Sequence, residues 1–363
     1  CMKLNEQNVL LFSRTMGQGG AEKVVLQICE ILLPHVNKVV VCSSGGVNVK
    51  KLNEMSVKHY VIPDIGKKSV KKGVETLHIL SEIIKKEKIT VIHSHHRMAA
   101  FYSKVLREKY NVVLINTVHN VFFNKRKLTY WGYKNTNLIA CGEHVKDNLI
   151  DYFCMPPEQV STIHNAVDTK LVPFGDNKRL KELHNQGFFL VGNIGRLTRQ
   201  KGMSFFIKSM INIRKENLKI KYIIIGDGKD RDELLKLTDE LELKDDIIFL
   251  GYVSNISNIL NQLDLVVLSS LWEGLPLTPI EAFSMGRTVI GTDVGGTSEI
   301  ISDARNGYLI SPRSSDAISD KVIYLFNNSI KRKILERNAH KTYLSKFRLS
   351  IFEKKTLDYY ESI

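Results

Sequence analysis

Residues 269–282 read SSLWEGLPLTPIEA, and this stretch decides how the rest of the sequence is interpreted. It holds two glutamates, Glu273 and Glu281, with seven residues between them. It begins at the end of an apolar, β-branched run, Leu265–Ser269, which predicts a buried strand. A carboxylate placed just after a strand can accept hydrogen bonds from two vicinal hydroxyls, the groups that sugars present.

The second part of the stretch predicts the start of a helix. We expect Thr278 to be its N-cap and Pro279 to occupy the first helical position. The free backbone N–H groups of that helix start then form a phosphate site without any side chain. Thr278 and Glu281 have the spacing of a capping box, which gives Glu281 a structural explanation. Glu273 lies before the helix and has no such structural explanation, so we expect its carboxylate to bind a ligand.

On both sides of this stretch, short β-branched runs alternate with amphipathic stretches along the whole chain. This alternation predicts βαβ units and parallel sheets. The expected strands are Val9–Ser13, Lys38–Cys42, Tyr60–Ile62, Thr90–His93, Val112–Thr117, Leu138–Cys141, Phe188–Ile194, Lys221–Ile225, Ile247–Leu250, Leu265–Ser269 and Thr288–Gly291. The clearest expected helices are Ala21–Leu33, Ser69–Lys86, Met98–Tyr110 and Ile351–Ile363.

A polar stretch interrupts the alternation at residues 168–187, which contain a proline and two glycines and show no clear periodicity. A chain of 363 residues is also long for one hydrophobic core. We therefore predict an α/β fold with two doubly wound domains, residues 1–168 and 169–345. Residues 346–363 would form a helix that packs back on the first domain. The carboxyl ends of the strands are the expected ligand site.

The loop at residues 195–202, GRLTRQKG, follows the first strand of the second half. Arg196 and Lys201 lie five positions apart between glycines, so they can close around a diphosphate. A basic loop exposed to solvent is the alternative. We favour phosphate binding because the loop lies at the edge where strand order is expected to reverse.

The loop at residues 16–22, MGQGGAE, precedes the first helix, and Gly19 and Gly20 allow a ligand to approach the backbone there. Its spacing fits neither the dinucleotide fingerprint nor the Walker A loop, and a tight strand-to-helix turn explains it equally well. Asp230 and Asp232 have the Asp-x-Asp spacing of a Mg²⁺ site. We assign them instead to a helix start, where acidic residues offset the macrodipole, and we expect no metal.

Four histidines follow strands of the first half. His93, His95 and His96 lie close together, but they are joined by no cysteine or carboxylate at metal-ligand spacing, so we favour packing or surface roles. His119 is expected at the carboxyl end of a strand, which makes it a candidate for function, with a polar lining role as the alternative.

The formal net charge is +14, and the basic excess lies mostly in the first half. A phosphate-bearing substrate, an anionic membrane face or nucleic acid could each explain it, as could a lysine-rich solvated surface. Nucleic acid ranks lowest because no nucleic-acid module accompanies the basic clusters, and we expect no such partner.

Targeting signals also bear on location. No apolar run is long enough to span a bilayer, and no signal-peptide pattern opens the chain. We therefore expect a cytoplasmic protein that is at most peripheral on the inner membrane face. Cys29, Cys42, Cys141 and Cys154 lack CxxC spacing, so we expect reduced packing residues.

Taken together, these motifs resemble the large retaining glycosyltransferase family of the GT-B fold known as family 4, or glycosyl transferases group 1. The matching segments are residues 19–22 (its glycine loop), 195–202 (its phosphate-binding segment), 273–282 (its E-x7-E signature) and 165–168 (its Asn-Gly-Val-Asp turn). Ala166 replaces the usual glycine of that turn, and the first half matches more loosely. The resemblance implies two Rossmann-like domains facing across a cleft, the first for the acceptor and the second for the nucleotide sugar.

The resemblance also implies a role for each matched residue of the second half. Arg196 and Lys201 would neutralise the nucleotide diphosphate, and the amides around Leu277 and Thr278 would bind phosphate. Glu281 would bind the ribose hydroxyls.

In the same way, Glu273 would contact the donor sugar, beside Gly274, and His119 would lie next to the reacting sugar. Gly19 and Gly20 would approach the donor, and the backbone at Val253 would frame the base.

We therefore expect a retaining hexosyl- or N-acetylhexosaminyltransferase that uses a nucleotide sugar, UDP-sugar before GDP-sugar, and no metal. The expected acceptor is a glycan or a lipid-linked precursor of cell-surface polysaccharide or glycoconjugate, at an anionic membrane surface. Two other types stay open: an epimerase or phosphorylase of the same fold, and a non-catalytic nucleotide-sugar-binding protein.

Overall fold

The computed structural model describes residues 3–67, 69–168 and 175–363, which divide into two compact units. The N-terminal unit holds the described residues up to Asn165 together with Ser350–Ile363, and the C-terminal unit holds those from Ala166 to Leu349. The predicted boundary between residues 168 and 169 borders residues 169–174, which lie outside the described part of the chain.

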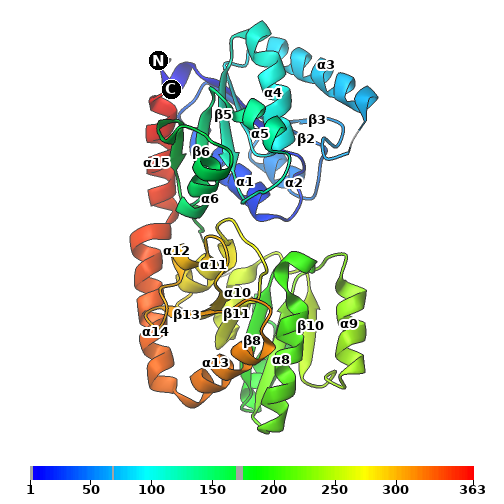
Figure 1. Ribbon diagram of the computed structural model, residues 1–363, viewed down its shortest axis with the longest axis vertical. Helices are drawn as coiled ribbons and strands as arrows, with labels where there is room; N and C mark the ends of the chain where they lie inside the picture. Colours follow the sequence, from blue (N-terminus) through cyan, green and yellow to red (C-terminus); the bar gives the residue numbers. More distant parts are fainter. Residues whose placement is uncertain (1–2, 68, 169–174) are drawn as a thin grey trace. The chain divides into compact units, whose positions relative to one another are not determined.

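The N-terminal unit contains a seven-stranded parallel sheet in the order β3-β2-β1-β4-β5-β6-β7 (Figure 1). Its strands are β1 (Asn8–Phe12), β2 (Lys38–Ser43), β3 (Lys58–Val61), β4 (Val91–Ser94), β5 (Val113–Val118), β6 (Asn137–Ala140) and β7 (Val160–Thr162). Its helices are α1 (Gly20–Leu32), α2 (Val49–Glu54), α3 (Val70–Glu87), α4 (Arg97–Tyr110), α5 (Arg126–Tyr133), α6 (Glu143–Asp147) and most of α15 (Leu349–Glu361).

The C-terminal unit contains a six-stranded parallel sheet in the order β10-β9-β8-β11-β12-β13. Its strands are β8 (Phe189–Ile194), β9 (Ile220–Ile225), β10 (Ile247–Gly251), β11 (Leu265–Leu268), β12 (Val289–Thr292) and β13 (Gly307–Ile310). Its helices are α7 (Lys178–Asn185), α8 (Met203–Lys215), α9 (Arg231–Glu240), α10 (Ile256–Gln262), α11 (Leu277–Ser284), α12 (Thr297–Ile300), α13 (Ser315–Asn327) and α14 (Ser329–Thr342).

Both sheets are built from central strands that are buried on both faces. Every residue of β1, β8 and β11 is buried, which is why these strands appear in the sequence as continuous apolar runs. On β4, Ile92 packs into the core formed with α3 and α4, and His93 faces the opposite side, toward α1 and α15. Strand order reverses between β1 and β4 in one sheet and between β8 and β11 in the other. These two switch points are where ligands bind in doubly wound folds.

The predicted α/β class and paired doubly wound sheets are confirmed, and each predicted strand has a counterpart. Strands β7 and β13 were not predicted, because they are short and lie at the sheet edges, so they lack a long apolar run. No helix was predicted within residues 168–187, which interrupt the alternation of strands and helices. Helix α7 lies within them, and it buries only Leu180, which leaves almost no apolar periodicity in the sequence.

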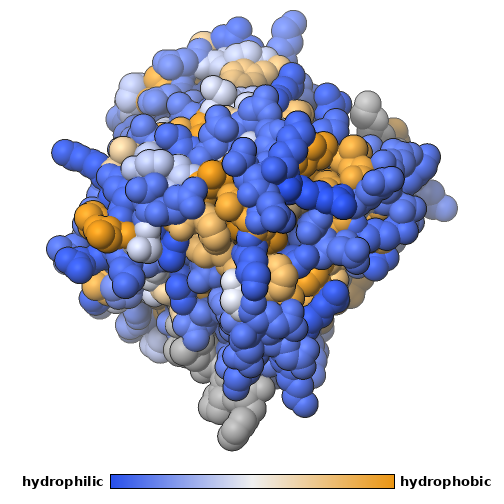
Figure 2. Space-filling model, turned by 90° about the horizontal axis from the view of Figure 1, so that it is seen from below, coloured by the Kyte–Doolittle hydropathy of each residue, from blue (hydrophilic) through white to orange (hydrophobic). Residues whose placement is uncertain are grey.

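The surface is largely hydrophilic over the face drawn in Figure 2, with small groups of hydrophobic residues between the polar ones. Within residues 3–67, 69–168 and 175–363, no helix has both the length and the apolar character that crossing a bilayer requires.

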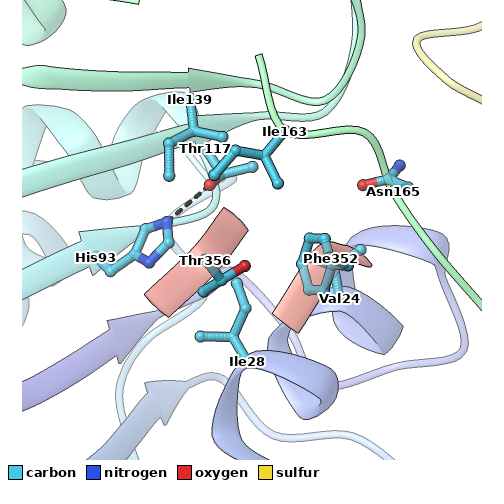
Figure 3. Close-up of a pocket in the computed structure, with 9 residues that line it drawn as sticks. All are labelled: Val24, Ile28, His93, Thr117, Ile139, Ile163, Asn165, Phe352 and Thr356. Atoms are coloured by element: carbon cyan, nitrogen blue, oxygen red, sulfur yellow. Dashed lines mark hydrogen bonds between the residues drawn. The ribbon is translucent and has the colours of Figure 1, made fainter. Parts of the chain in front are cut away.

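Helix α15 is anchored in the N-terminal unit by one buried tyrosine. The Tyr360 side chain is completely buried, and its hydroxyl lies 2.7 Å from His93 Nδ1. Gln7 Nε2 donates to the Tyr360 carbonyl oxygen at 3.0 Å. Between α15, α1 and the sheet lies a small pocket whose lining includes His93, Thr117 and Phe352 (Figure 3).

Replacing this tyrosine should weaken the attachment of α15. Tyr360→Phe removes the hydroxyl and leaves His93 Nδ1 buried without that partner, so the free energy of unfolding should fall by about 1–3 kcal/mol. Urea unfolding measures the loss, and hydrogen exchange should show faster exchange in residues 350–363. Tyr359→Phe, one residue earlier and only partly buried, is the matched control. Equal effects of the two substitutions would contradict the anchoring role.

Candidate functional site

The loops after β8 and β11 meet at the switch point of the C-terminal unit through a buried ion pair. Lys201 Nζ lies 2.6 Å from Glu273 Oε1, and the two side chains are 16% and 7% exposed. Ser270 Oγ donates to the same carboxylate oxygen, also at 2.6 Å. The expectation that nothing structural requires a carboxylate at Glu273 is therefore wrong. Lys201, 72 residues away on the loop after β8, and Ser270, on the same loop as Glu273, both contact this carboxylate.

Backbone contacts hold the same two loops together. Leu271 N donates to the Gln200 carbonyl oxygen at 2.7 Å, and Gln200 Nε2 donates to the Trp272 carbonyl oxygen at 2.9 Å. Gly202 has φ of +58°, and a Cβ there would lie 2.1 Å from the Ser269 carbonyl oxygen. Only glycine meets both conditions, so the loop carrying Lys201 is fixed against the loop carrying Glu273.

Helix α11 begins two residues earlier than its capping pattern predicts. Pro276 is the N-cap, with extended backbone angles, and Leu277 is the first helical residue. The capping box expected between Thr278 and Glu281 is wrong, because Thr278 lies inside the first turn and its Oγ1 donates to the Ile194 carbonyl oxygen at 3.3 Å.

The shift determines which amides the helix start can offer. An α-helix leaves the N–H groups of its N-cap and first three residues without intrahelical partners. Pro276 and Pro279 hold two of these four positions and have no N–H. Leu277 and Thr278 therefore carry the two N–H groups that α11 itself leaves unused. An anion at this helix start would be bound by these adjacent amides.

The remaining candidates of the C-terminal unit lie on α11 itself and on loops that follow strands of the same sheet. Glu281 is buried in α11, and Arg196 is exposed on the loop after β8. The Gly274 carbonyl oxygen accepts a hydrogen bond from Gly296 N at 2.7 Å, which ties the Glu273 loop to the loop after β12. Val253 follows β10, which pairs with β9. These residues, with Lys201, Glu273, Leu277 and Thr278, all belong to loops and one helix at the carboxyl edge of a single sheet.

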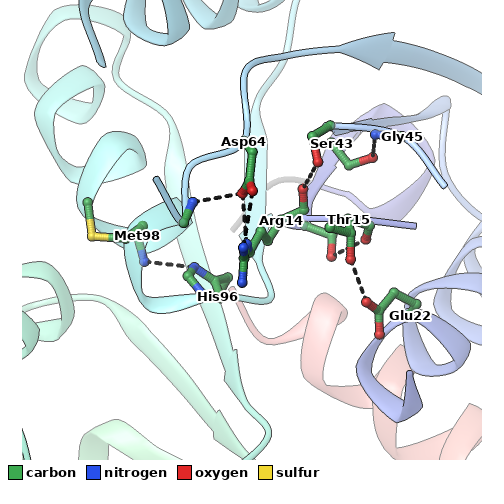
Figure 4. A network of polar contacts seen from close by, with 11 residues as sticks. Arg14, Thr15, Glu22, Ser43, Gly45, Asp64, His96 and Met98 are labelled. Carbon is green, nitrogen blue, oxygen red and sulfur yellow. Dashed lines mark hydrogen bonds and ion pairs between the residues drawn. The ribbon is translucent and has the colours of Figure 1, made fainter. Parts of the chain in front are cut away.

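Gly19, Gly20 and His119 belong to the other unit. Gly19 is the N-cap of α1, and the carboxylate of Glu22 folds back over it, accepting a hydrogen bond from Thr15 Oγ1 at 2.6 Å (Figure 4). A Cβ at Gly19 would lie 2.2 Å from Glu22 Oε2. Gly19 therefore makes room for the carboxylate of Glu22. Its negative charge already occupies the start of α1, the place at which the sequence suggested that an anion could bind.

An ion pair that no sequence motif indicated lies beside this loop. Arg14, two residues past β1, donates to both carboxylate oxygens of Asp64, at 2.7 and 3.1 Å (Figure 4). This contact lowers the pKa of Asp64 to about 2. His96 is the N-cap of α4, where Nδ1 accepts from Met98 N, and burial first and then Arg14 lower its pKa to about 4. Arg14 could have been found from its position directly after a predicted strand.

His93, His95 and His119 form one contiguous group, in which His93 and His95 are buried and His119 is partly buried. His95 Nδ1 lies 3.0 Å from His119 Nε2, and the ring of His95 stacks on that of His93 at 4.3 Å between centroids. Burial lowers the pKa of His93 to about 3 and that of His119 to about 4, and it lowers the pKa of His95 as well. All three are therefore neutral at pH 7. In the described part of the chain, no three His, Cys, Asp or Glu residues are grouped as metal ligands.

Comparison with known proteins gives consistent matches. The family model described as Glycosyltransferase Family 4 matches residues 18–171, and the model described as Glycosyl transferases group 1 matches residues 175–342. Between them the two models include all the candidate residues from Gly19 to Glu281.

Individual relatives match over most of the chain. It is 28% identical over 345 residues to the UDP-Gal:alpha-D-GlcNAc-diphosphoundecaprenol alpha-1,3-galactosyltransferase of Escherichia coli, covering 87% of this chain and 89% of that protein. It is 26% identical over 264 residues to the poly(ribitol-phosphate) alpha-N-acetylglucosaminyltransferase of Staphylococcus aureus, covering 70% and 51%. Its fold is similar to that of HepE from Anabaena, solved in complex with UDP, with a TM-score of 0.86, 18% identity and coverage of 98% and 100%.

The buried histidines should make stability depend on pH. Their pKa values are lowered in the folded protein, whereas an unfolded histidine has a pKa of about 6.5. Below that pH only the unfolded chain takes up protons, so the free energy of unfolding should fall between pH 7.5 and 5.5. The slope is up to ~1.4 kcal/mol per pH unit for each histidine.

Urea unfolding at several pH values measures this slope. His119→Asn removes one titrating group and should make the slope shallower, whereas His78→Asn, at an exposed position of α3, should leave it unchanged. A stability that is flat between pH 7.5 and 5.5 would contradict the assignment of neutral buried histidines.

The Lys201–Glu273 pair should contribute to stability cooperatively. Glu273→Gln keeps the side-chain shape but removes the charge that pairs with Lys201, so it should lower the free energy of unfolding by about 1–3 kcal/mol. Combined with Lys201→Met, the loss should be smaller than the sum by about 1 kcal/mol or more.

The matched control is the exposed pair Lys236–Glu240 on α9, at 3.5 Å with side chains 77% and 58% exposed. A double-mutant cycle at Lys236 and Glu240 should give a coupling free energy of roughly 0.5 kcal/mol or less. Urea unfolding of the four variants in each cycle provides the values. Additive losses at Lys201 and Glu273 would show that the two charges do not support each other.

Proposed function

Because the chain belongs to the glycosyl transferases group 1 of family 4 and has the GT-B fold, we propose that it transfers a sugar from a UDP-sugar with retention of configuration. The sugar is a hexose or an N-acetylhexosamine, and the acceptor is a glycan or a lipid-linked precursor in cell-surface polysaccharide or glycoconjugate synthesis. A GDP-sugar is the second candidate donor.

The observation that carries this proposal is the start of α11 beside Lys201. Breaking the bond between sugar and phosphate leaves negative charge on the departing diphosphate, and fixed donors aimed at that charge lower the barrier. The amides of Leu277 and Thr278 supply two such donors, and Lys201 and Arg196 supply positive charge. These four groups compensate the developing charge without a metal ion.

The other candidate residues then receive roles around the donor. Glu273 Oε1 already accepts from Lys201 and Ser270, so the carboxylate is held for recognition of sugar hydroxyls rather than for attack on the anomeric carbon. Glu281 binds the ribose hydroxyls of the donor. Val253 lines the base end of the donor site, and Gly274 lines its sugar end. With no nucleophilic role for Glu273, the leaving phosphate assists deprotonation of the acceptor on the same face.

The N-terminal unit provides His119 and the loop of Gly19 and Gly20. His119 follows β5, so it is assigned to the reacting sugar, and the glycine loop to the edge of the donor site. Glu22 already lies over Gly19, which favours contact with sugar hydroxyls at this loop over contact with phosphate.

The choice of donor and acceptor draws support from the relatives. The E. coli relative is described by UDP-Gal and by a diphosphoundecaprenol acceptor, and HepE is solved with UDP and with UDP-glucose. The S. aureus relative acts on poly(ribitol-phosphate). An anionic acceptor fits the net charge of +14 and its bias to the first half, which also favours charge-driven contact with an anionic membrane surface.

A donor panel tests the proposal. The protein is incubated with UDP- and GDP-sugars, binding is measured by calorimetry, and nucleotide release and sugar products are measured by mass spectrometry. We expect a UDP-sugar to bind and to be slowly hydrolysed without acceptor. Lys201→Met should lower kcat/KM about 10²–10³-fold, because it removes a charge aimed at the leaving group.

Lys236→Met, on the exposed face of α9, is the matched control and should leave both binding and turnover unchanged. Conversion of the donor to its epimer would instead identify an epimerase, and tight binding without turnover across acceptors would identify a binding protein. Failure of every nucleotide sugar to bind would overturn the proposal.

A further inference from the structure

Two polar side chains at the switch point of the N-terminal unit take no part in the function proposed above. Strand order reverses there between β1 and β4. Arg14 lies two residues past the end of β1, and His96 lies two residues past the end of β4. In doubly wound folds, the loops at this position are the ones that contact a ligand.

The Arg14 guanidinium is held in one orientation by the chain around it. Its Nε and Nη2 donate to the two carboxylate oxygens of Asp64, and Gly66 N donates to Asp64 Oδ1 at 2.9 Å (Figure 4). A Cβ at Gly66 would lie 2.3 Å from the Arg14 guanidinium carbon, so this glycine makes room for the guanidinium. Ser44 donates to the Arg14 carbonyl oxygen from its N–H and from its hydroxyl, at 3.0 and 2.9 Å. The side chain of Arg14 is 45% exposed, yet it is already ordered for binding.

The contacts of His96 determine which of its nitrogens carries the proton. Nδ1 accepts a hydrogen bond from Met98 N at 3.2 Å, so Nδ1 is bare. Burial first and then the charge of Arg14 lower the pKa of His96 to about 4, so the ring is neutral at pH 7. A neutral imidazole has one N–H and one bare nitrogen, which places the proton on Nε2.

These three side chains keep unused hydrogen-bonding capacity. Among residues 3–67, 69–168 and 175–363, neither Arg14 Nη1 nor His96 Nε2 has a hydrogen-bond partner. Asp64 Oδ2 accepts only from Arg14 Nη2, so it can accept one further hydrogen bond. The charge of Arg14 acts on the imidazole, which places the two free donors near each other. Two donors and one acceptor are therefore available together.

The charges around these groups favour an uncharged ligand. Arg14 is paired with Asp64, and the carboxylate of Glu22 also acts on its charge. Two further cations, Arg97 and Lys125, act on the imidazole, so three positive and two negative side chains nearly balance. A phosphate that reached the free nitrogen of Arg14 would approach both carboxylates, which repel it.

We propose that Arg14, Asp64 and His96 bind an uncharged sugar ring of the acceptor through two neighbouring hydroxyls. The hydroxyl oxygens accept from Arg14 Nη1 and His96 Nε2, and one of the hydroxyls donates to Asp64 Oδ2. Each hydroxyl can donate and accept at once, whereas a fully ionised phosphate has no proton to donate. The identification of this sugar as the acceptor rests on the proposed function, but the ability of the site to bind a sugar does not.

Saturation-transfer NMR on the intact protein, with UDP present, tests the site directly. The probes are methyl α-glucoside, methyl α-galactoside and methyl N-acetyl-α-glucosaminide. We expect at least one of them to receive saturation from the protein, and inorganic phosphate not to displace it. Failure of all three to bind, or their displacement by phosphate, would overturn the inference.

One substitution separates the structural role of His96 from its role in binding. His96→Asn keeps an N-cap acceptor for Met98 N but removes the Nε2–H donor. Urea unfolding should therefore be nearly unchanged, while the affinity for the bound glycoside should fall about tenfold. Asp64→Asn should weaken binding as well. Asp239→Asn, whose carboxylate pairs with Lys244 at the surface of the C-terminal unit, is the matched control and should bind like the unmodified protein.

Hydrolysis of the donor distinguishes a failure of this site from a failure of the proposed function. Slow hydrolysis of the UDP-sugar without acceptor should be unchanged in His96→Asn, whereas the KM for the glycoside as acceptor should rise. If the glycoside binds as expected but no nucleotide sugar is ever turned over, the proposed function fails and the sugar site stands. If the donor is hydrolysed but the glycoside binds equally well to His96→Asn and to the unmodified protein, the sugar site is wrong.

Discussion

One buried contact, between Lys201 Nζ and Glu273 Oε1, organises the C-terminal unit. It joins the loops after the two strands at which the sheet order reverses, and Glu273 lies on the loop that leads into α11. A buried ion pair contributes little net stability compared with apolar packing, but loss of one partner is unfavourable, so the geometry is held once formed. Gly202 and the peptide of Ser269 allow the loops to approach closely enough for the pair to exist.

Much of the fold could be predicted from the sequence because buried parallel strands are continuous apolar runs. β8 and β11 were located within a residue or two for this reason, whereas the edge strands β7 and β13 had no such run. The start of α11 was misplaced because Thr278 and Glu281 fit a local capping pattern. In the folded chain, the extended angles of Pro276 set the N-cap instead, and Thr278 bonds a residue 84 positions away.

The candidate site was harder to derive than the fold because its contacts join distant parts of the chain. The types and strand-end positions of Glu273, Lys201 and His119 pointed to chemistry, but no local pattern could show that Lys201 and Ser270 converge on one carboxylate oxygen. The same holds for His95, which was assigned a packing role and whose partner His119 lies 24 residues further on.

Helix α15 has a consequence for how the protein is made. Residues 350–363 belong to the N-terminal unit, yet the ribosome releases them after the whole C-terminal unit. Until then His93 lacks the Tyr360 hydroxyl, and the pocket lined by Val24 and Ile28 lacks Phe352 and Thr356. The apolar face of the nascent N-terminal unit that includes Val24 and Ile28 therefore stays uncovered while the C-terminal unit is synthesised. Chaperone binding during translation would be concentrated on that face.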